Sequence, residues 1–149
     1  MKTGVIILFH NYENELEPKV LIEQIQQLDT IPICLVNNES KDNTYDIVKD
    51  IRDHCPNVSV VNIKKFKSDL SAIRAGARYL LSARKLKTLG YINTNLIPVD
   101  FGLAHLFEDV ISYREQLFKS RLPLLKPNNT NIRNQLFSII DELHRLEAV

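Results

Sequence analysis

Four segments of the chain concentrate the side chains that could take part in chemistry, and each follows directly on an apolar run. They are residues 10–15, 37–44, 64–69 and 93–95. Glu13 and Glu39, from two of these segments, carry carboxylate oxygens, the ligands that hard divalent cations prefer. Exposed loop carboxylates are more often only hydrated, so a cation site and a solvated loop both remain open here.

A second group of candidates is cationic. Lys64, Lys65 and Lys67 precede a helical pattern on which Arg74 and Arg78 lie one turn apart. Together they could form a local positive patch that neutralises a diphosphate in place of a metal ion. The alternative is that the apolar residues of this helix are buried and the cations occupy its hydrated side.

Short apolar runs precede the polar segments and predict four strands, at residues 5–9, 31–36, 58–63 and 89–92. Spacings near three and four predict helices between and after them, at residues 16–28, 47–51, 70–81, about 100–119 and about 130–146. Strand and helix alternate with short connections, which is typical of βαβ crossovers. We therefore expect an α/β protein with a mostly parallel open sheet, helices on both faces in a Rossmann-like three-layer sandwich, and C-terminal helices.

Composition limits the classes of function. The 149 residues carry a net charge of +1, with 2 cysteines and 4 glycines. The near-neutral charge argues against nucleic acid as a partner, and the cysteine number argues against a disulfide framework or a four-ligand zinc site. The glycines lie too far apart for a Gly-X-Gly-X-X-Gly turn or a Walker loop. We expect a single domain over residues 1–149, cytoplasmic, with no membrane span and with a helical part over about residues 100–149.

Parallel sheets bind ligands at the carboxyl ends of their strands, and the residues after three of these strands, together with part of the third helix, resemble a known family. Residues 35–44, Leu-Val-Asn-Asn-Glu-Ser-Lys-Asp-Asn-Thr, resemble the second strand and turn of the inverting family 2 glycosyltransferases of the GT-A fold, usually Val-Asp-Asp-Gly-Ser-Thr-Asp-Gly-Thr. Residues 5–15 resemble the Pro-Thr-Tyr-Asn-Glu segment of that family, and residues 71–76 its Ala-Arg-Asn-X-Gly helix. Residues 92–95, Ile-Asn-Thr-Asn, fall where the family places its Asp-X-Asp.

This resemblance implies a site for a nucleotide diphosphate sugar of the UDP-sugar type. The nucleotide-binding residues that it implies are Asn11, Tyr12, Glu13, Asn38 and Arg74. Asn38 takes the place of a base-contacting Asp, although asparagines of this loop are also common turn residues and Tyr12 could simply pack at a strand exit.

The positions of the metal motif are where the chain departs from its relatives. Asn93 and Asn95 stand in for the Asp-X-Asp, and neutral amides do not readily replace two anionic ligands. No metal ligand set is therefore assigned, and Mn²⁺ or Mg²⁺ is expected only if the mechanism of the family is retained. The short segment after Asn95 also predicts that the acceptor-binding half of the family, which supplies the general base, is missing.

Two functions follow as hypotheses. The first is a glycosyltransferase-like protein that binds a nucleotide sugar and transfers it with inversion only when another chain completes it. The second is a non-catalytic, degenerate relative that acts as a dimerisation or interaction module. Whether the chain is an enzyme stays open, and no catalytic residue is assigned. A partner transferase subunit is expected in the first case, and a homodimer or another interaction partner in the second. The apolar residues of the last helix, with heptad-like spacing from Leu136 to Leu146, could dock on their own domain or on a second copy.

Overall fold

The computed structural model describes residues 3–119 and 136–148 of the chain. In chain order the elements are β1 (Thr3–Phe9), α1 (Pro18–Gln26), β2 (Ile33–Asn38), α2 (Thr44–His54), β3 (Val58–Ile63), α3 (Asp69–Ala83), β4 (Thr88–Asn93), the 3₁₀ turn η1 (Thr94–Leu96), α4 (Leu103–Ser112), α5 (Arg114–Phe118), β5 (Leu136–Ser138) and α7 (Ile139–Glu147). The predicted alternation of strands and helices over the first two thirds of the chain is confirmed.

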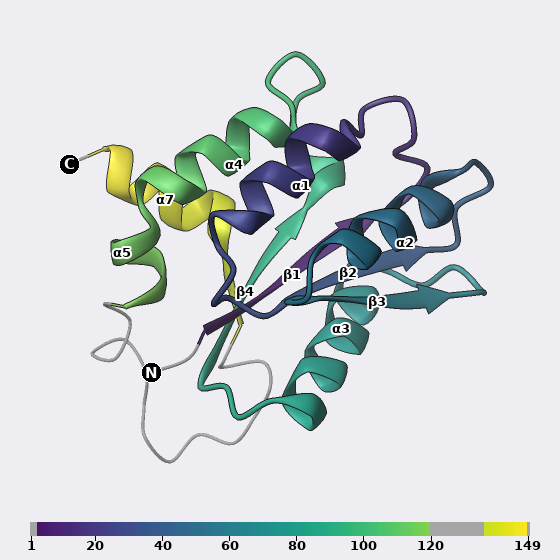
Figure 1. Cartoon of the computed structure of the whole chain (residues 1–149), viewed down its shortest axis with the longest axis horizontal. Coiled ribbons are helices and arrows are strands. Elements are labelled where there is room, and N and C mark those ends of the chain that lie inside the picture. The colour runs from purple at the N-terminus through teal and green to yellow at the C-terminus, as the bar shows by residue number, and fades with distance from the viewer. Residues whose placement is uncertain (1–2, 120–135, 149) are drawn as a thin grey trace.

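The sheet has five parallel strands in the order β3-β2-β1-β4-β5 (Figure 1). β1 lies in its centre and pairs with β2 on one side and β4 on the other. All seven residues of β1 are buried, which explains why its apolar run is continuous rather than alternating. The α/β class with a parallel open sheet is confirmed.

Two hydrophobic cores cover the two faces of the sheet. Val5, Ile7 and Phe9 of β1 point into the larger core, which includes apolar residues of α1, α2, α4, α5 and α7. Ile6 and Leu8 point into the smaller core, against α3. Figure 1 shows α1 and α4, which are in contact, on one side of the sheet and α3 on the other. The predicted arrangement with helices on both faces is confirmed.

The C-terminal part differs from the two long helices predicted there. The first ends at Ser112, because Tyr113 has non-helical dihedrals, and α5 follows as a separate helix. The first of these helices, α4, also starts later than predicted. It begins after Gly102, whose φ of 81° lies in the left-handed region that favours glycine.

A fifth strand replaces part of the last predicted helix. Residues 136–138 extend the sheet beside β4, and α7 begins only at Ile139; residues 130–135 lie outside the described part of the chain. Gly90 of β4 makes this approach feasible, since a Cβ there would lie 2.8 Å from Ile139 Cγ1. Ile139 and Leu143 are buried, so α7 docks its apolar side on its own fold.

No helix in the described segments has the length and apolar character needed to cross a membrane.

Candidate functional site

The strand order places a topological switch point between β1 and β4. The chain moves from β1 to β2 and β3 on one side, then crosses back to β4 on the other. Open parallel sheets bind ligands outside the carboxyl ends of their strands at such a point. We call this end of the sheet the carboxyl edge; it carries residues 10–13, 37–40, 64–69 and 93–95. The four polar segments singled out in the sequence therefore meet at one edge.

Asn38, the last residue of β2, is fully buried and binds the β3–α3 loop. Its Nδ2 donates to the Lys67 carbonyl oxygen at 2.8 Å, and its Oδ1 accepts from the Lys67 backbone N–H at 3.0 Å. The orientation of the amide is fixed, because a carbonyl can only accept and an N–H can only donate. Both polar groups of the side chain are thus engaged in holding Lys67.

Asn11 joins the loop after β1 to the loop after β2. Its φ of 47° lies in the left-handed region, which Asn tolerates better than most residues. Its backbone N–H donates to Ser40 Oγ at 2.9 Å, and its Oδ1 accepts from the Lys41 N–H at 2.7 Å. The predicted nucleotide-binding residue is therefore also a structural link between two loops.

Tyr12 and Glu13 lie in the same turn with different surroundings. The Tyr12 ring is buried, 5.6 Å from the Phe9 ring between centroids. Burial, together with the charge of Glu15, raises the pKa of the Tyr12 hydroxyl. Glu13 is partly exposed, and its Oε1 accepts from Asn43 Nδ2 at 2.9 Å. Of these two, Glu13 is the side chain that the structure leaves near the surface of the edge.

Asn93 and Asn95, the residues at the position of the family's metal motif, contact a carboxylate from another element. Asn93 Nδ2 donates to Asp69 Oδ2 at 2.8 Å, and Asn95 Nδ2 lies 3.5 Å from Asp69 Oδ1. Asn93 Oδ1 accepts from the Asn95 N–H at 3.0 Å and so caps η1. Sequence reasoning missed Asp69, because its partners lie 24 and 26 residues away in the sequence.

This arrangement does not fit a divalent cation. Asn93 is fixed with its amide N–H toward Asp69 and its oxygen toward a backbone N–H, so a cation bound to Asp69 would meet the N–H side of this amide and not its oxygen. Among the residues that the structure describes, no group of three or more His, Cys, Asp or Glu side chains could hold a metal ion. The Asp69 carboxylate beside these two amides already accepts hydrogen bonds from them.

His10 and Phe66 form an aromatic pair that sequence reasoning also missed. Their ring centroids lie 4.8 Å apart, and Phe66 is 51% exposed. His10 Nδ1 lies 2.7 Å from the Asn38 carbonyl oxygen, so Nδ1 carries the proton in this bond, and Nε2 is left to accept from Asn11 Nδ2 at 3.3 Å. The Phe66 N–H donates to Glu39 Oε2 at 3.0 Å. The sequence did offer one indication of this pair, because Phe66 is an aromatic residue inside a loop that is otherwise rich in lysine.

The cationic candidates lie on the surface. Lys64, Lys65 and Lys67 are all exposed in the loop between β3 and α3. Arg74 is partly exposed on the second turn of α3 and makes no hydrogen bond or ion pair with the described residues, and Arg78 is exposed one turn further on. The three lysines therefore sit at the carboxyl edge with their charges available to an anion.

The comparisons with solved structures give partial matches. TarS of S. aureus matches with a TM-score of 0.49 and 18% identity, over 64% of this chain and 17% of that structure. The mannosyltransferase PcManGT from Pyrobaculum calidifontis, solved in complex with GDP-Man and Mn²⁺, matches with a TM-score of 0.41 and 17% identity, over 53% of this chain and 24% of that one. The chain thus spans roughly a sixth to a quarter of their length. No curated protein matches it in sequence.

A family model gives the assignment. The model described as glycosyl transferase family 2 matches residues 4–82, more than half of the chain. The matched region runs from β1 to α3 and contains the segments after β1, β2 and β3. Asn93 and Asn95 lie beyond it, so their likeness to the metal motif rests on the resemblance in sequence alone. On the extent of this match, the chain belongs to glycosyl transferase family 2.

Proposed function

We propose that the chain binds a nucleoside diphosphate sugar of the UDP-sugar type across the carboxyl edge. The observation that carries the proposal is the family match over residues 4–82, which includes three of the four polar segments of this edge. The fourth segment, after β4, lies beside them because β4 pairs directly with β1.

The nucleobase of the nucleotide sugar would stack on the aromatic pair His10 and Phe66. A nucleobase is a flat aromatic ring, and such rings gain about 1 to 3 kcal/mol by stacking on exposed aromatic side chains. Phe66 presents half of its surface to solvent, while its backbone is held by Glu39. Asn38 holds the next residue, Lys67, so the platform is fixed from both sides before a ligand arrives.

The diphosphate would be neutralised by lysines rather than by a metal ion. Lys64, Lys65 and Lys67 lie in the same loop as Phe66, within one or two residues of it. Ammonium groups are strong donors to phosphate oxygens. Because the residues at the metal-motif position do not fit a divalent cation, we route no step of binding or transfer through one.

Transfer of the sugar would be an inverting displacement at the anomeric carbon, with a hydroxyl acceptor and a nucleoside diphosphate leaving group. It needs a general base within hydrogen-bond reach of the acceptor hydroxyl. We assign no such base to this chain, and we propose transfer only when a partner transferase subunit supplies the acceptor half.

The second candidate function is that of a non-catalytic relative that uses the fold as an interaction or dimerisation module. The observation that favours it is the bonding of Asn93 and Asn95 to Asp69, which replaces a cation site by a closed network of hydrogen bonds. The two candidates differ in whether a nucleotide binds at all.

Calorimetric titration with UDP, GDP and UMP, each in the presence of EDTA, tests the first candidate. We expect a diphosphate to bind and the triple variant Lys64→Ala, Lys65→Ala, Lys67→Ala to weaken it by about tenfold or more. The matched control is Lys85→Ala with Lys87→Ala, two exposed lysines on the connection from α3 to β4, at the opposite end of the sheet. Absence of binding by both diphosphates at millimolar concentration, in a folded protein, contradicts the proposal.

Manganese binding followed by electron paramagnetic resonance tests the metal-free character of the edge separately. We expect the wild-type chain to leave Mn²⁺ free at about 1 mM, and the double variant Asn93→Asp, Asn95→Asp to capture it, because three carboxylates then surround one point. Capture of Mn²⁺ by the wild-type chain that is lost in Asp69→Asn would show that Asp69 and its two amides do hold a cation.

A further inference from the structure

A cavity separate from the carboxyl-edge network lies between α4, α7 and the segment that joins η1 to α4. Its volume is about 470 Å³, and its apolar wall includes Leu96, Ile97, Leu106, Ile140 and Leu143. Drug-sized ligands occupy cavities of roughly 300 to 1,000 Å³ with mostly apolar walls and a few polar groups. None of Asp69, Asn93 and Asn95 lines it.

The apolar surface continues outside the cavity. Leu96 is 67% exposed and Phe101 39% exposed, and both line the cavity. Val99, two residues before Phe101, is 80% exposed. Large apolar side chains that gather beside a hollow, rather than scattering singly, are a feature of ligand and interaction sites.

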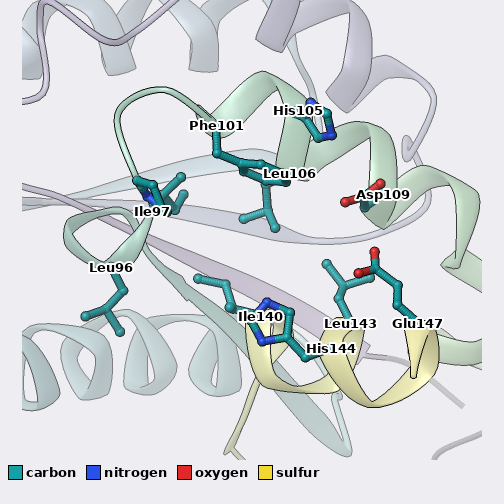
Figure 2. Close-up of a pocket in the computed structure, with 11 residues that line it drawn as sticks. Leu96, Ile97, Phe101, His105, Leu106, Asp109, Ile140, Leu143, His144 and Glu147 are labelled. Atoms are coloured by element: carbon teal, nitrogen blue, oxygen red, sulfur yellow. The ribbon is translucent and has the colours of Figure 1, made fainter. Parts of the chain in front are cut away.

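Two carboxylates lie together at one end of the cavity. Figure 2 shows Asp109 of α4 and Glu147 of α7 at the same end of the cavity, the end away from Leu96 and Ile97, with the Glu147 side chain extending toward α4. Neither side chain has a hydrogen bond or ion pair with the described residues. Arg145 of α7 is engaged by Glu142.

The remaining polar residues of the wall are His105 and His144. The ring of His105 on α4 lies 4.1 Å from that of Phe101 between centroids, and His144 lies on α7 beside Ile140 in Figure 2. Both are exposed. The described wall of the cavity contains these two carboxylates and no Lys or Arg side chain.

We propose that this cavity binds a small amphiphilic cation, with an apolar body between α4 and α7 and an ammonium or guanidinium head between Asp109 and Glu147. Both carboxylates line the same end of the cavity, so a cation placed beside them is attracted by two negative charges. The apolar body would remove the exposed surface of Leu96 and Phe101, which line the same cavity, from water. An anion with the same body would add a third negative charge. The inference does not depend on the proposed nucleotide site.

Three probes with one chain length and different heads test the charge preference: octylammonium, octanol and octanoate, each titrated into the ¹⁵N-labelled full chain at pH 8. We expect octylammonium to shift amide resonances of α4 and α7 and to bind roughly five- to tenfold more tightly than octanol, with octanoate weakest. The double variant Asp109→Asn, Glu147→Gln should remove the advantage of the ammonium over the alcohol. Octanol binding to that variant should be unchanged, which shows that its cavity is intact.

Asp53→Asn on α2 is the matched control, an exposed carboxylate on a helix that does not line the cavity, and it should change none of the three affinities. The proposal is overturned if octylammonium causes no shifts at 10 mM, if its shifts fall on elements other than α4, α7 and the segment that joins η1 to α4, or if octanoate binds as tightly as octylammonium. It is equally overturned if the ammonium preference survives the double variant. A concentration-dependent dimer that closes the cavity to all three probes would identify a second copy as the occupant instead.

Discussion

At the scale of single residues, the amides of the carboxyl edge serve the architecture first. Asn38 holds Lys67, Asn11 holds Lys41, and Asn93 caps η1 while it binds Asp69. An amide can donate and accept at once, whereas a carboxylate can only accept, so these positions use a capacity that Asp lacks. The loss of carboxylates relative to the family pattern therefore has a structural explanation at Asn38 and Asn93, beside any change of function.

Asn38→Asp, which restores the family's residue, should destabilise the fold. A carboxylate at this fully buried position would face the Lys67 carbonyl, acceptor against acceptor, and would bring a charge into the interior. We expect a loss of about 2 to 4 kcal/mol in the free energy of unfolding, measured by urea denaturation. Asn14→Asp, in the exposed loop before α1, should change it by less than about 0.5 kcal/mol. Equal effects of the two substitutions would contradict the role given to Asn38.

Asp42 should make stability depend on pH. Burial alone raises its pKa, but hydrogen bonds from the Thr44 side chain and backbone and from the Glu13 N–H outweigh burial and lower the pKa. A lowered pKa in the folded state means that the stabilisation is present above the usual value of about 3.9 and is lost as pH falls through the lowered value. Wild type should therefore exceed Asp42→Asn in urea midpoint at pH 7, and the difference should shrink by pH 3. A difference that stays constant with pH would rule out this linkage.

The residues of the edge were only partly predictable from the sequence. The polar segments follow from the rule that parallel strands end at one edge, so Asn11, Asn38 and Asn93 could be placed there. Their hydrogen-bond partners could not, because Lys67 and Asp69 approach through the β3–α3 loop, whose path no periodicity describes. Phe66 was missed for the same reason: its contact with His10 joins two loops that are 56 residues apart in the printed sequence.

At the scale of elements, the packing of α3 against the sheet depends on Gly76. A Cβ at this position would lie 2.8 Å from Val36 Cγ2 and 2.9 Å from Ile6 Cγ2, both in fully buried side chains. Glycine inside a helix costs about 1 kcal/mol relative to alanine, so its presence here indicates that close approach matters more than propensity. Gly76 therefore sets the distance of α3 from β1 and β2. The loop before α3, which carries Phe66, is positioned with it.

Gly76→Ala should therefore destabilise the chain despite its better helix propensity. Overpacking of a well-packed core costs typically 1 to 3 kcal/mol, against a gain of about 1 kcal/mol from propensity, so we expect a net loss of about 1 kcal/mol. A double-mutant cycle with Val36→Ala, measured by urea denaturation, should show a favourable coupling, because the smaller side chain leaves room for the new methyl group. Ser82→Ala, exposed on the same helix, is the control. Stabilisation by Gly76→Ala would mean that α3 can shift outward at no cost.

Element prediction succeeded where burial is two-sided and failed near the C-terminus. β1 and β2 are covered on both faces, so their apolar runs are unambiguous. β5 has three residues and pairs on one side only, which is too short for any periodicity, and its apolar residues continue in register with those of α7. The break at Tyr113 was missed because the buried apolar residues on either side of it, Val110 and Leu117, are seven positions apart and fit one helical face.

At the scale of the whole molecule, the region that matches the family model and the rest of the chain build different parts of the fold. Residues 4–82 contain β1, β2 and β3 with the three helices that follow them. β4 and β5 then extend the sheet on the other side of β1, and α4 and α7 cover the larger core there. The proposed nucleotide site lies over the first part, and the proposed cation-binding cavity belongs to the second, so each can be removed by substitution without touching the other.

The reactivity of the two cysteines can show whether these two parts of the chain unfold together. Burial raises the pKa of Cys34 on β2 to about 12, although a hydrogen bond with Ser59 acts in the opposite direction, and burial also raises the pKa of Cys55 at the end of α2. At pH 8 the thiolate of native Cys34 is then on the order of one part in ten thousand, and reagent must wait for the chain to open.

We expect Ellman's reagent to leave Cys34 unmodified in the native chain at pH 8 and to modify both thiols at once in denaturant. The native-state rate for Cys34 should rise in parallel with the equilibrium constant for global unfolding across a urea series, because β2 sits between β1 and β3 and cannot be exposed alone. Cys55→Ala isolates the signal of Cys34. A native-state rate that is independent of urea would instead mean that β2 becomes accessible through a local opening that exposes little surface.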